Sequence, residues 1–312
     1  MVSPVSTANS YSAILDNLMA AQNKEITAQQ EVSTGKKGDD LAGFGDQTRN
    51  LVATNTVKSR VDGMVDQLNQ LQVKLHFQQT ALGQVSDTAN DLKQALTNAL
   101  ATGSGDGLMD SISSYFSQAS EALNVQYGGD YLFSGGQTQT QPFTATSMSD
   151  LTTGTVASFF QNGNLPQASQ IDDNTTIQTG FLASNVGQQL MQSFQDIQNF
   201  QQGPDGNFGG NLTDAQQTFI QNMITTLGGV TNAATQTTAT GGEIQSRVEA
   251  ATTTQTDRQT TLKNVVGDMT SVNMAQAASD LTQAQSAVQA SAQVFMTLRG
   301  MSLLNYLTPS SS

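Results

Sequence analysis

The longest regular pattern in the sequence is a series of apolar residues that alternates steps of three and four between residues 61 and 99. This spacing places the series on one narrow face of an α-helix, as in a coiled coil. At 1.5 Å per residue, a helix over residues 48–101 would be about 80 Å long, and the glycine-rich run Gly103–Gly107 would end it. Apart from the polar Gln78, the members are Val61, Met64, Leu68, Leu71, Leu75, Leu82, Val85, Ala89, Leu92, Leu96 and Ala99.

The five prolines leave two long stretches without proline, residues 5–141 and 205–308. An interior proline costs a helix about 3 kcal/mol, so both stretches can hold long helices. We predict a mainly α fold, a long antiparallel coiled-coil-like helical bundle formed by both chain ends, with a small β-containing domain inserted in the middle. The predicted parts are terminal helical segments over residues 1–40 and 271–312, a helical rod domain over residues 41–140 and 205–270, and an outer β-containing domain over residues 141–204.

Two further apolar series predict helices that accompany the long one. A short helix over residues 108–127 would fold back on it, because the connection between the two is glycine-rich. A second long helix over residues 219–272 is less regular, since Gln255 and Arg258 occupy positions on its apolar face. The pair Gly241-Gly242 is a candidate bend in that helix.

The middle of the chain loses the helical period over residues 128–182. An aromatic run between glycines, Gly128–Gly136, predicts a strand or a tight hairpin. Residues 154–160 and 175–179 are predicted to form further strands, and helical spacing returns over residues 186–200.

Both ends of the chain carry amphipathic helical patterns rich in small residues. One series runs from Tyr11 to Val32, and the other alternates three and four from Met274 to Leu298. The second series does not continue the register of the preceding helix, so we expect a hinge between Ser271 and Met274. Because alanine buries little area, each helix would be marginal alone and needs a partner for its apolar stripe. That partner is either the other terminal helix of the same chain or another subunit.

The charge of the chain excludes several classes of partner. The formal net charge is −13, and residues 94–246 contain eleven acidic residues but no Lys or Arg. Nucleic acids and anionic membranes attract basic surfaces, so neither is expected as a partner. No window approaches 18 uninterrupted apolar residues, which predicts no membrane span, and the absence of Cys excludes disulfides and thiolate chemistry.

Side chains suited to catalysis are few. His76 is the single histidine, and we expect it to be solvated or to lie at an interface. The pairs Asp39-Asp40 and Asp172-Asp173 could bind a cation or act as acid and base, although adjacent acids in loops usually face water. We therefore predict no enzyme activity, no cofactor, and no catalytic or metal-binding residues.

Four segments of the sequence carry a family resemblance: Val32–Asp40, Tyr131–Phe143, Asn273–Leu281 and Met301–Leu307. They resemble motifs of the bacterial flagellar hook–filament junction proteins, also called hook-associated protein three, which are relatives of flagellin. The first and last motifs are shared with flagellin, whereas the second favours the junction proteins.

The resemblance, which covers residues 5–143 and 180–307, implies a structural component of the flagellum. Such a junction adaptor joins the hook, through the first hook-associated protein, to the flagellin filament. The implied partners are further copies in a ring, the first hook-associated protein, flagellin and an export chaperone. The implied location is extracellular, after export through the flagellar type III apparatus without signal cleavage, with termini that are disordered in the monomer and form an inner tube on assembly. Two alternatives stay open: flagellin itself, and an enzyme or adhesin carried by residues 144–204.

The residues expected at the assembly interface lie on the two terminal helical patterns and near the end of the chain. They are Leu15, Leu18, Ala21, Ala28, Val32, Met274, Ala277, Leu281, Ala284, Val288, Ser291, Phe295, Leu298, Leu303 and Leu304.

Overall fold

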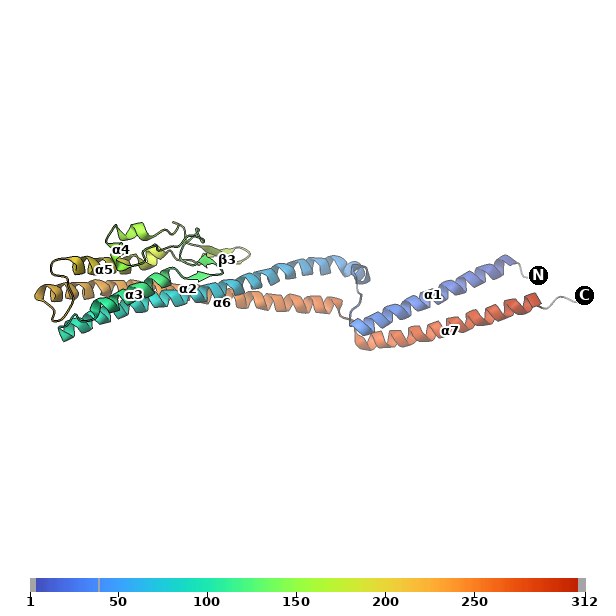
Figure 1. Cartoon of the computed structure of the whole chain (residues 1–312). Helices are drawn as coiled ribbons and strands as arrows, with labels where there is room; N and C mark the ends of the chain where they lie inside the picture. Colours follow the sequence, from blue (N-terminus) through green and yellow to red (C-terminus); the bar gives the residue numbers. More distant parts are fainter. Residues whose placement is uncertain (1–3, 39, 308–312) are drawn as a thin grey trace, which may run out of the picture. The chain divides into compact units, whose positions relative to one another are not determined.

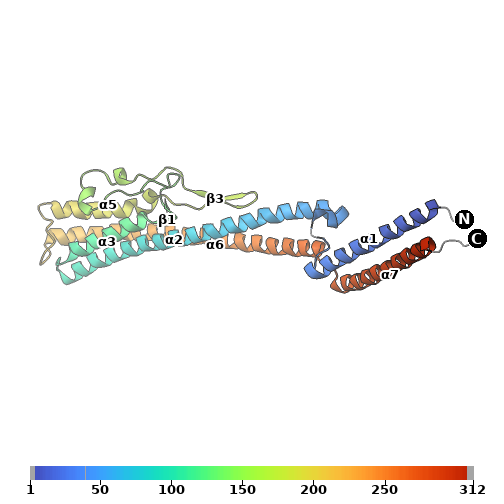
Figure 2. The same cartoon turned by 45° about the vertical axis from the view of Figure 1, so that its right-hand side comes forward.

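The computed structural model of the chain describes residues 4–38 and 40–307, with side-chain environments between residues 12 and 297. The chain divides into two compact units. The terminal unit consists of the chain up to Val61 and from Arg258 onward, and the central unit runs from Asp62 to Asp257. The elements of each unit are labelled in Figures 1 and 2.

Long helices make up most of the described chain, which confirms the predicted fold class of a helical bundle with a small inserted β-containing region. None of the described helices is long and apolar enough to cross a membrane. In chain order, the elements are α1 (Pro4–Thr34), the 3-10 helix η1 (Leu41–Gln47), α2 (Thr48–Thr102), α3 (Leu108–Leu123), β1 (Gln126–Tyr127), β2 (Asp130–Tyr131), α4 (Met148–Leu151), the 3-10 helix η2 (Val156–Phe159), β3 (Ala168–Asp172), β4 (Thr175–Gln178), α5 (Ala183–Gln202), α6 (Asp214–Thr270) and α7 (Met274–Leu307).

The core of the central unit lies between four helices, α2, α3, α5 and α6 (Figures 1 and 2). Its largest apolar cluster includes Leu92 of α2, Phe116 of α3, Phe194 of α5 and Leu227 of α6. Every member of the series over residues 61–99 is buried except Met64, which is half-buried. The heptad pattern therefore predicted the buried face of α2, and α3 folds back on α2 as expected.

Two small antiparallel hairpins form the β structure of the described chain. In the glycine-flanked run Gly128–Gly136, only β2 lies where a strand or hairpin was predicted. Its partner β1 precedes Gly128, in residues that were predicted to belong to the helix over residues 108–127, whereas α3 ends at Leu123. The predicted strand over residues 175–179 is β4, and its partner β3 has no counterpart among the predicted strands. Ile171 and Ile177 attach the β3–β4 hairpin to the two long helices, where they join an apolar cluster with Leu68, Leu71, Leu75 and Val248.

The β3–β4 region also explains the polar residues in the apolar series. The side-chain amide of Gln78 donates to the carbonyl oxygen of Thr179 (2.9 Å) and accepts from the N–H of Phe181 (3.1 Å). Nε2 of Gln255 donates to Oδ1 of Asp172 at 2.9 Å. Both glutamines are buried, because the inserted segment supplies the partners that a buried amide needs.

The strand predicted over residues 154–160 is wrong, because η2 lies there instead. The carbonyl oxygen of Thr155 accepts from both the N–H (2.9 Å) and the hydroxyl (2.7 Å) of Ser158, which closes a tight turn. The turn buries Val156 in the main cluster, and only Phe160 makes a bridge, with Phe143.

The predicted bend at Gly241-Gly242 is also wrong, because α6 is continuous through this pair. Gly241 is buried against α2, and a Cβ added there would lie 3.0 Å from Cδ1 of Leu82. The glycine therefore allows close approach of α2 and α6.

The predicted break near Ser271–Met274 is confirmed, since α6 ends at Thr270 and α7 begins at Met274. The residues between them pair with the loop that follows α1. The N–H of Lys37 donates to the carbonyl oxygen of Thr270 (2.8 Å), and the N–H of Val272 donates to that of Gly35 (3.0 Å). Backbone bonds within the terminal unit thus hold the break in place.

Candidate assembly surface

The helices α1 and α7 of the terminal unit lie side by side and run in opposite directions (Figures 1 and 2). Ala21 and Ala28 of α1 and Ala277 and Ala284 of α7 are buried. Small side chains let two helices approach closely, but they bury less apolar area than leucine would. The structure therefore pairs the two terminal helices within one chain, the first of the two partners considered.

The other predicted interface residues are distributed along the same helix pair. Met274 is exposed at the start of α7, while Leu298, Leu303 and Leu304 belong to α7 but have side chains outside the described residues. Seven are half-buried: Leu15, Leu18, Val32, Leu281, Val288, Ser291 and Phe295. The structure thus brings residues of both chain ends together, and their contact with other subunits stays a prediction.

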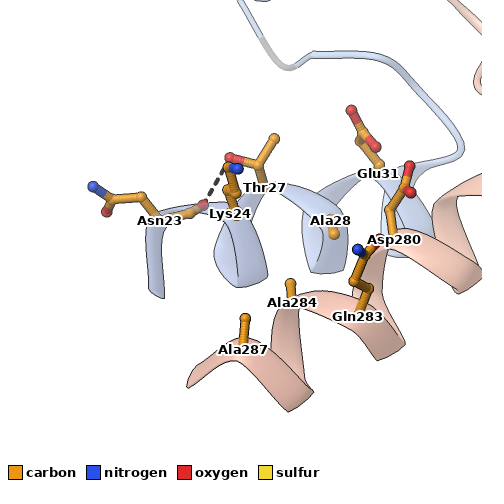
Figure 3. A pocket seen from close by; sticks show the side chains of 9 residues that line it. All are labelled: Asn23, Lys24, Thr27, Ala28, Glu31, Asp280, Gln283, Ala284 and Ala287. Carbon is orange, nitrogen blue, oxygen red and sulfur yellow. Dashed lines mark hydrogen bonds between the residues drawn. The ribbon is translucent and has the colours of Figure 1, made fainter. Parts of the chain in front are cut away.

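A groove runs beside the alanine contact between α1 and α7 (Figure 3). Small side chains form its apolar part, with Ala28 on α1 facing Ala284 and Ala287 on α7. Polar side chains border it, namely Asn23, Lys24, Thr27 and Glu31 from α1 and Asp280 and Gln283 from α7. Because small residues line the contact between the two helices, the groove leaves room for a further side chain or helix.

Large apolar side chains remain exposed on the helix pair at positions that the predicted interface did not include. Met19 (53% exposed) and Ile26 (55% exposed) lie on α1, and Val294 and Met296 lie on α7. Met19 and Ile26 are seven residues apart, so they share one face of α1. That repeat of seven was the sequence signal for a second apolar line outside the main series.

The acidic residues and the histidine that were considered for chemistry have ordinary structural roles or face solvent. Oδ1 of Asp40 accepts a backbone N–H of η1 (3.1 Å) and caps that helix, while Asp39 lies outside the described residues. Asp172 is bonded to Gln255 of α6, and His76 is exposed on α2. Across the described part of the chain, no group of three or more His, Asp or Glu side chains could hold a metal ion.

The net charge of the chain is distributed unequally between its two units. The terminal unit contains nine basic and eight acidic residues, a net charge of +1, whereas the central unit contains three basic and 17 acidic residues, a net charge of −14. One of those three cations, Lys74, is half-buried and donates to Oε1 of Gln167. Its burial lowers the pKa of Lys74, and the negative charge of Asp130 partly offsets this effect.

Comparison with known proteins gives this arrangement a family. Residues 5–138 match the bacterial flagellin N-terminal helical region, and residues 216–307 match the bacterial flagellin C-terminal helical region. The chain belongs to the flagellin superfamily. The two flagellin regions comprise α1 to the β1–β2 hairpin at one end and most of α6 with α7 at the other, and they make the chain a structural component of the flagellum.

Two solved structures share the fold of this flagellin relative. One is a protein from Vibrio parahaemolyticus named as a flagellar hook-associated protein, with a TM-score of 0.55 and 14% identity over 74% of this chain and 98% of that one. The other is FlgL of Bacillus cereus, with a TM-score of 0.54 and 13% identity over 68% of this chain and 97% of that one. A sequence search of curated proteins finds no match.

Proposed function

We propose that the chain is a junction adaptor of the bacterial flagellum, which joins the hook, through the first hook-associated protein, to the flagellin filament. The main support is that two solved structures share its fold over nearly their whole length, one named as a hook-associated protein and the other as FlgL. In this proposal the segments 1–40 and 271–312 make the inner assembly contacts. Residues 41–140 and 205–270 form the rod, and residues 141–204 form the outer domain.

The surface of the terminal unit supports this proposal. It keeps apolar side chains such as Met19, Ile26 and Met296 in water, and burying one such side chain is worth about 1.5–3 kcal/mol. Its net charge of +1 adds little repulsion when copies gather, whereas the central unit, at −14, favours a solvated outer position. No catalytic role is part of the proposal, and the partners are further copies, the first hook-associated protein, flagellin and an export chaperone.

Deletion of the gene tests the junction role against the flagellin alternative. Without a junction adaptor, cells should keep their hooks and release flagellin into the medium without building filaments, as seen by electron microscopy and by protein analysis of the medium. Loss of the bulk filament protein itself would instead identify the chain as flagellin. Purified flagella add a copy-number measurement, in which a junction protein is a minor component.

A matched pair of variants tests the role of the exposed apolar line on α1. Ile26→Glu removes an exposed apolar side chain and adds one negative charge, while Gln29→Glu adds the same charge at another exposed position of α1. We expect Ile26→Glu to reduce incorporation into flagella and Gln29→Glu to leave it near the wild-type level. If both variants are incorporated equally well, the exposed apolar line on α1 is not part of the proposed contacts.

A further inference from the structure

The central unit exposes an aromatic patch that its own fold does not cover. We define the patch as Val73 and Phe77 of α2 with Tyr127 of β1. These side chains are 45%, 43% and 36% exposed, and the rings of Phe77 and Tyr127 lie 5.3 Å apart between centroids. The ring of His76 meets that of Phe77 nearly edge-on, at an interplanar angle of 70°. Exposed aromatic side chains gathered in this way are typical of contact surfaces.

A short hairpin holds Tyr127 in the patch. β1 and β2 pair with Tyr127 opposite Asp130, and the turn between them is Gly128-Gly129, with φ values of 61° and 90° that suit glycine. The N–H of Tyr131 donates to the carbonyl oxygen of Thr138 (2.8 Å), which ties β2 to the following loop. The tyrosine is thus positioned before any partner arrives, which lowers the entropy lost on binding.

The terminal unit exposes a surface of complementary chemistry at the start of α2. Between Asp46 and Asp62 the chain contains three basic residues and no acidic residue. Arg49 and Arg60 are eleven residues apart, about three helical turns, so both lie on one face of α2. We define the basic strip as these two arginines with the neighbouring exposed side chains Val52, Ala53 and Val57.

We propose that the basic strip of one copy of the chain docks on the aromatic patch of a second copy. Valine side chains would cover Phe77 and Val73, while an arginine guanidinium would lie over the rings of Phe77 and Tyr127, an attractive cation–π arrangement. The strip carries positive charge and the unit that holds the patch carries −14, so the charges favour this pairing over contact between two central units.

The proposed contact is heterologous, because strip and patch are different surfaces. A heterologous contact leaves one strip and one patch free after each addition, so it builds a closed ring or a helical array rather than a dimer. This inference rests on the proposed assembly function and identifies one pair of surfaces through which the copies would assemble.

Site-directed cross-linking tests the contact, because the chain contains no cysteine and each introduced thiol is unique. Chains carrying Thr56→Cys, an exposed position beside Val57, are mixed with size-tagged chains carrying Gln126→Cys, an exposed position beside Tyr127. The mixture is treated with a short bismaleimide, as purified full-length protein in concentrated solution and in isolated flagella. The control pairs Thr56→Cys with Ala101→Cys, an exposed position on α2 about 36 Å along the helix from Phe77. We expect the mixed product to be at least about tenfold more abundant with Gln126→Cys than with Ala101→Cys.

The outcomes separate the contact from the function. Equal yields in flagella that contain the protein would overturn the contact and leave the junction role standing. If flagella lack the protein, the junction role fails, and the contact is then decided by the yields in solution. The double variant Arg49→Glu and Arg60→Glu should abolish the excess of mixed product in either sample. If the excess is unchanged in this variant, or if any added basic peptide abolishes it, the patch does not recognise this strip.

Discussion

Gln195 of α5 connects the inserted region to the helical core through a single side chain. Its Nε2 donates to the carbonyl oxygens of Leu151, the last residue of α4, and of Gly154, in the segment between α4 and η2, and Gln195 itself is buried. Replacement by alanine leaves two carbonyl groups without this donor, and one unsatisfied buried group costs about 1–3 kcal/mol. We expect Gln195→Ala to lower the free energy of unfolding of the central unit by about 2 kcal/mol, measured by urea denaturation. The control Gln188→Ala, at an exposed position of the same helix, should change it by less than about 0.5 kcal/mol.

Asp150 shows how a local cap changes the pKa of an exposed carboxyl group. The hydroxyl and backbone N–H of Thr146 and the backbone N–H of Ser147 donate to it, and these hydrogen bonds lower the pKa of Asp150 to about 2. Because the pKa of Asp150 is lower in the folded than in the unfolded chain, its ionised carboxylate stabilises the folded state. This stabilisation is fully present above the unfolded pKa near 4 and is lost as the pH falls through about 2. An NMR titration should give a midpoint near pH 2 for Asp150, and Thr146→Val should raise it. A midpoint near 4 in the unaltered protein would contradict the cap.

At the scale of elements, Gly187 of α5 lies directly against α3. A Cβ added to Gly187 would lie 2.5 Å from Cδ1 and 2.9 Å from Cδ2 of Leu123, which is fully buried. Overpacking of this kind costs about 1–3 kcal/mol, so Gly187→Ala should destabilise the central unit by that amount in urea denaturation. Gly242→Ala is the matched change in α6, where nothing lies within 4 Å of the added Cβ, and it should stabilise the unit by about 0.5–1 kcal/mol. Equal effects of the two changes would refute the close packing of α5 on α3.

The sequence pattern predicted those helices whose buried residues recur at regular intervals along one face. The face of α2 is an example, because one partner helix after another covers the same positions. The strand β3 has only one strongly apolar residue, Ile171, so its five residues carry no alternation to detect. The turn at η2 depends on Val156 reaching a core built by distant helices. No local pattern could show that Gln78 is satisfied by a segment a hundred residues further on.

The contact between α1 and α7 within the chain was predicted to a similar degree, whereas the assembly role of these residues stays a prediction. The alanines that pair α1 with α7 followed from the three-four spacing, since that spacing marks the face turned to the nearest helix. Met19 and Ile26 were not predicted, because they lie away from the buried alanines of α1 and stay more than half exposed. A pattern search that looks for one buried stripe finds the intramolecular partner first.

At the scale of the whole molecule, the two units differ in the kind of core they have. Among the described side chains, the buried apolar residues of the terminal unit are four alanines, with Leu51 and Val61. The central unit buries four phenylalanines almost completely, Phe116, Phe133, Phe143 and Phe194. Burial of a Phe or Leu side chain contributes about 1.5–3 kcal/mol, and alanine contributes much less. The terminal unit should therefore be the less stable of the two.

Calorimetry should accordingly show two thermal transitions, with the terminal unit melting first. Removal of residues 1–38 and 271–312 takes away α1 and α7 but leaves α2 and α6 whole, so it should abolish the lower transition and leave the upper one within a few degrees of its original temperature. Phe116→Ala should act in the opposite way, because loss of a buried phenylalanine costs about 3–5 kcal/mol and the ring lies in the core of the central unit. A single transition that the truncation and Phe116→Ala shift together would mean that the alanine-lined helix pair folds only as part of the central unit, and α1 and α7 could then not rearrange separately during assembly.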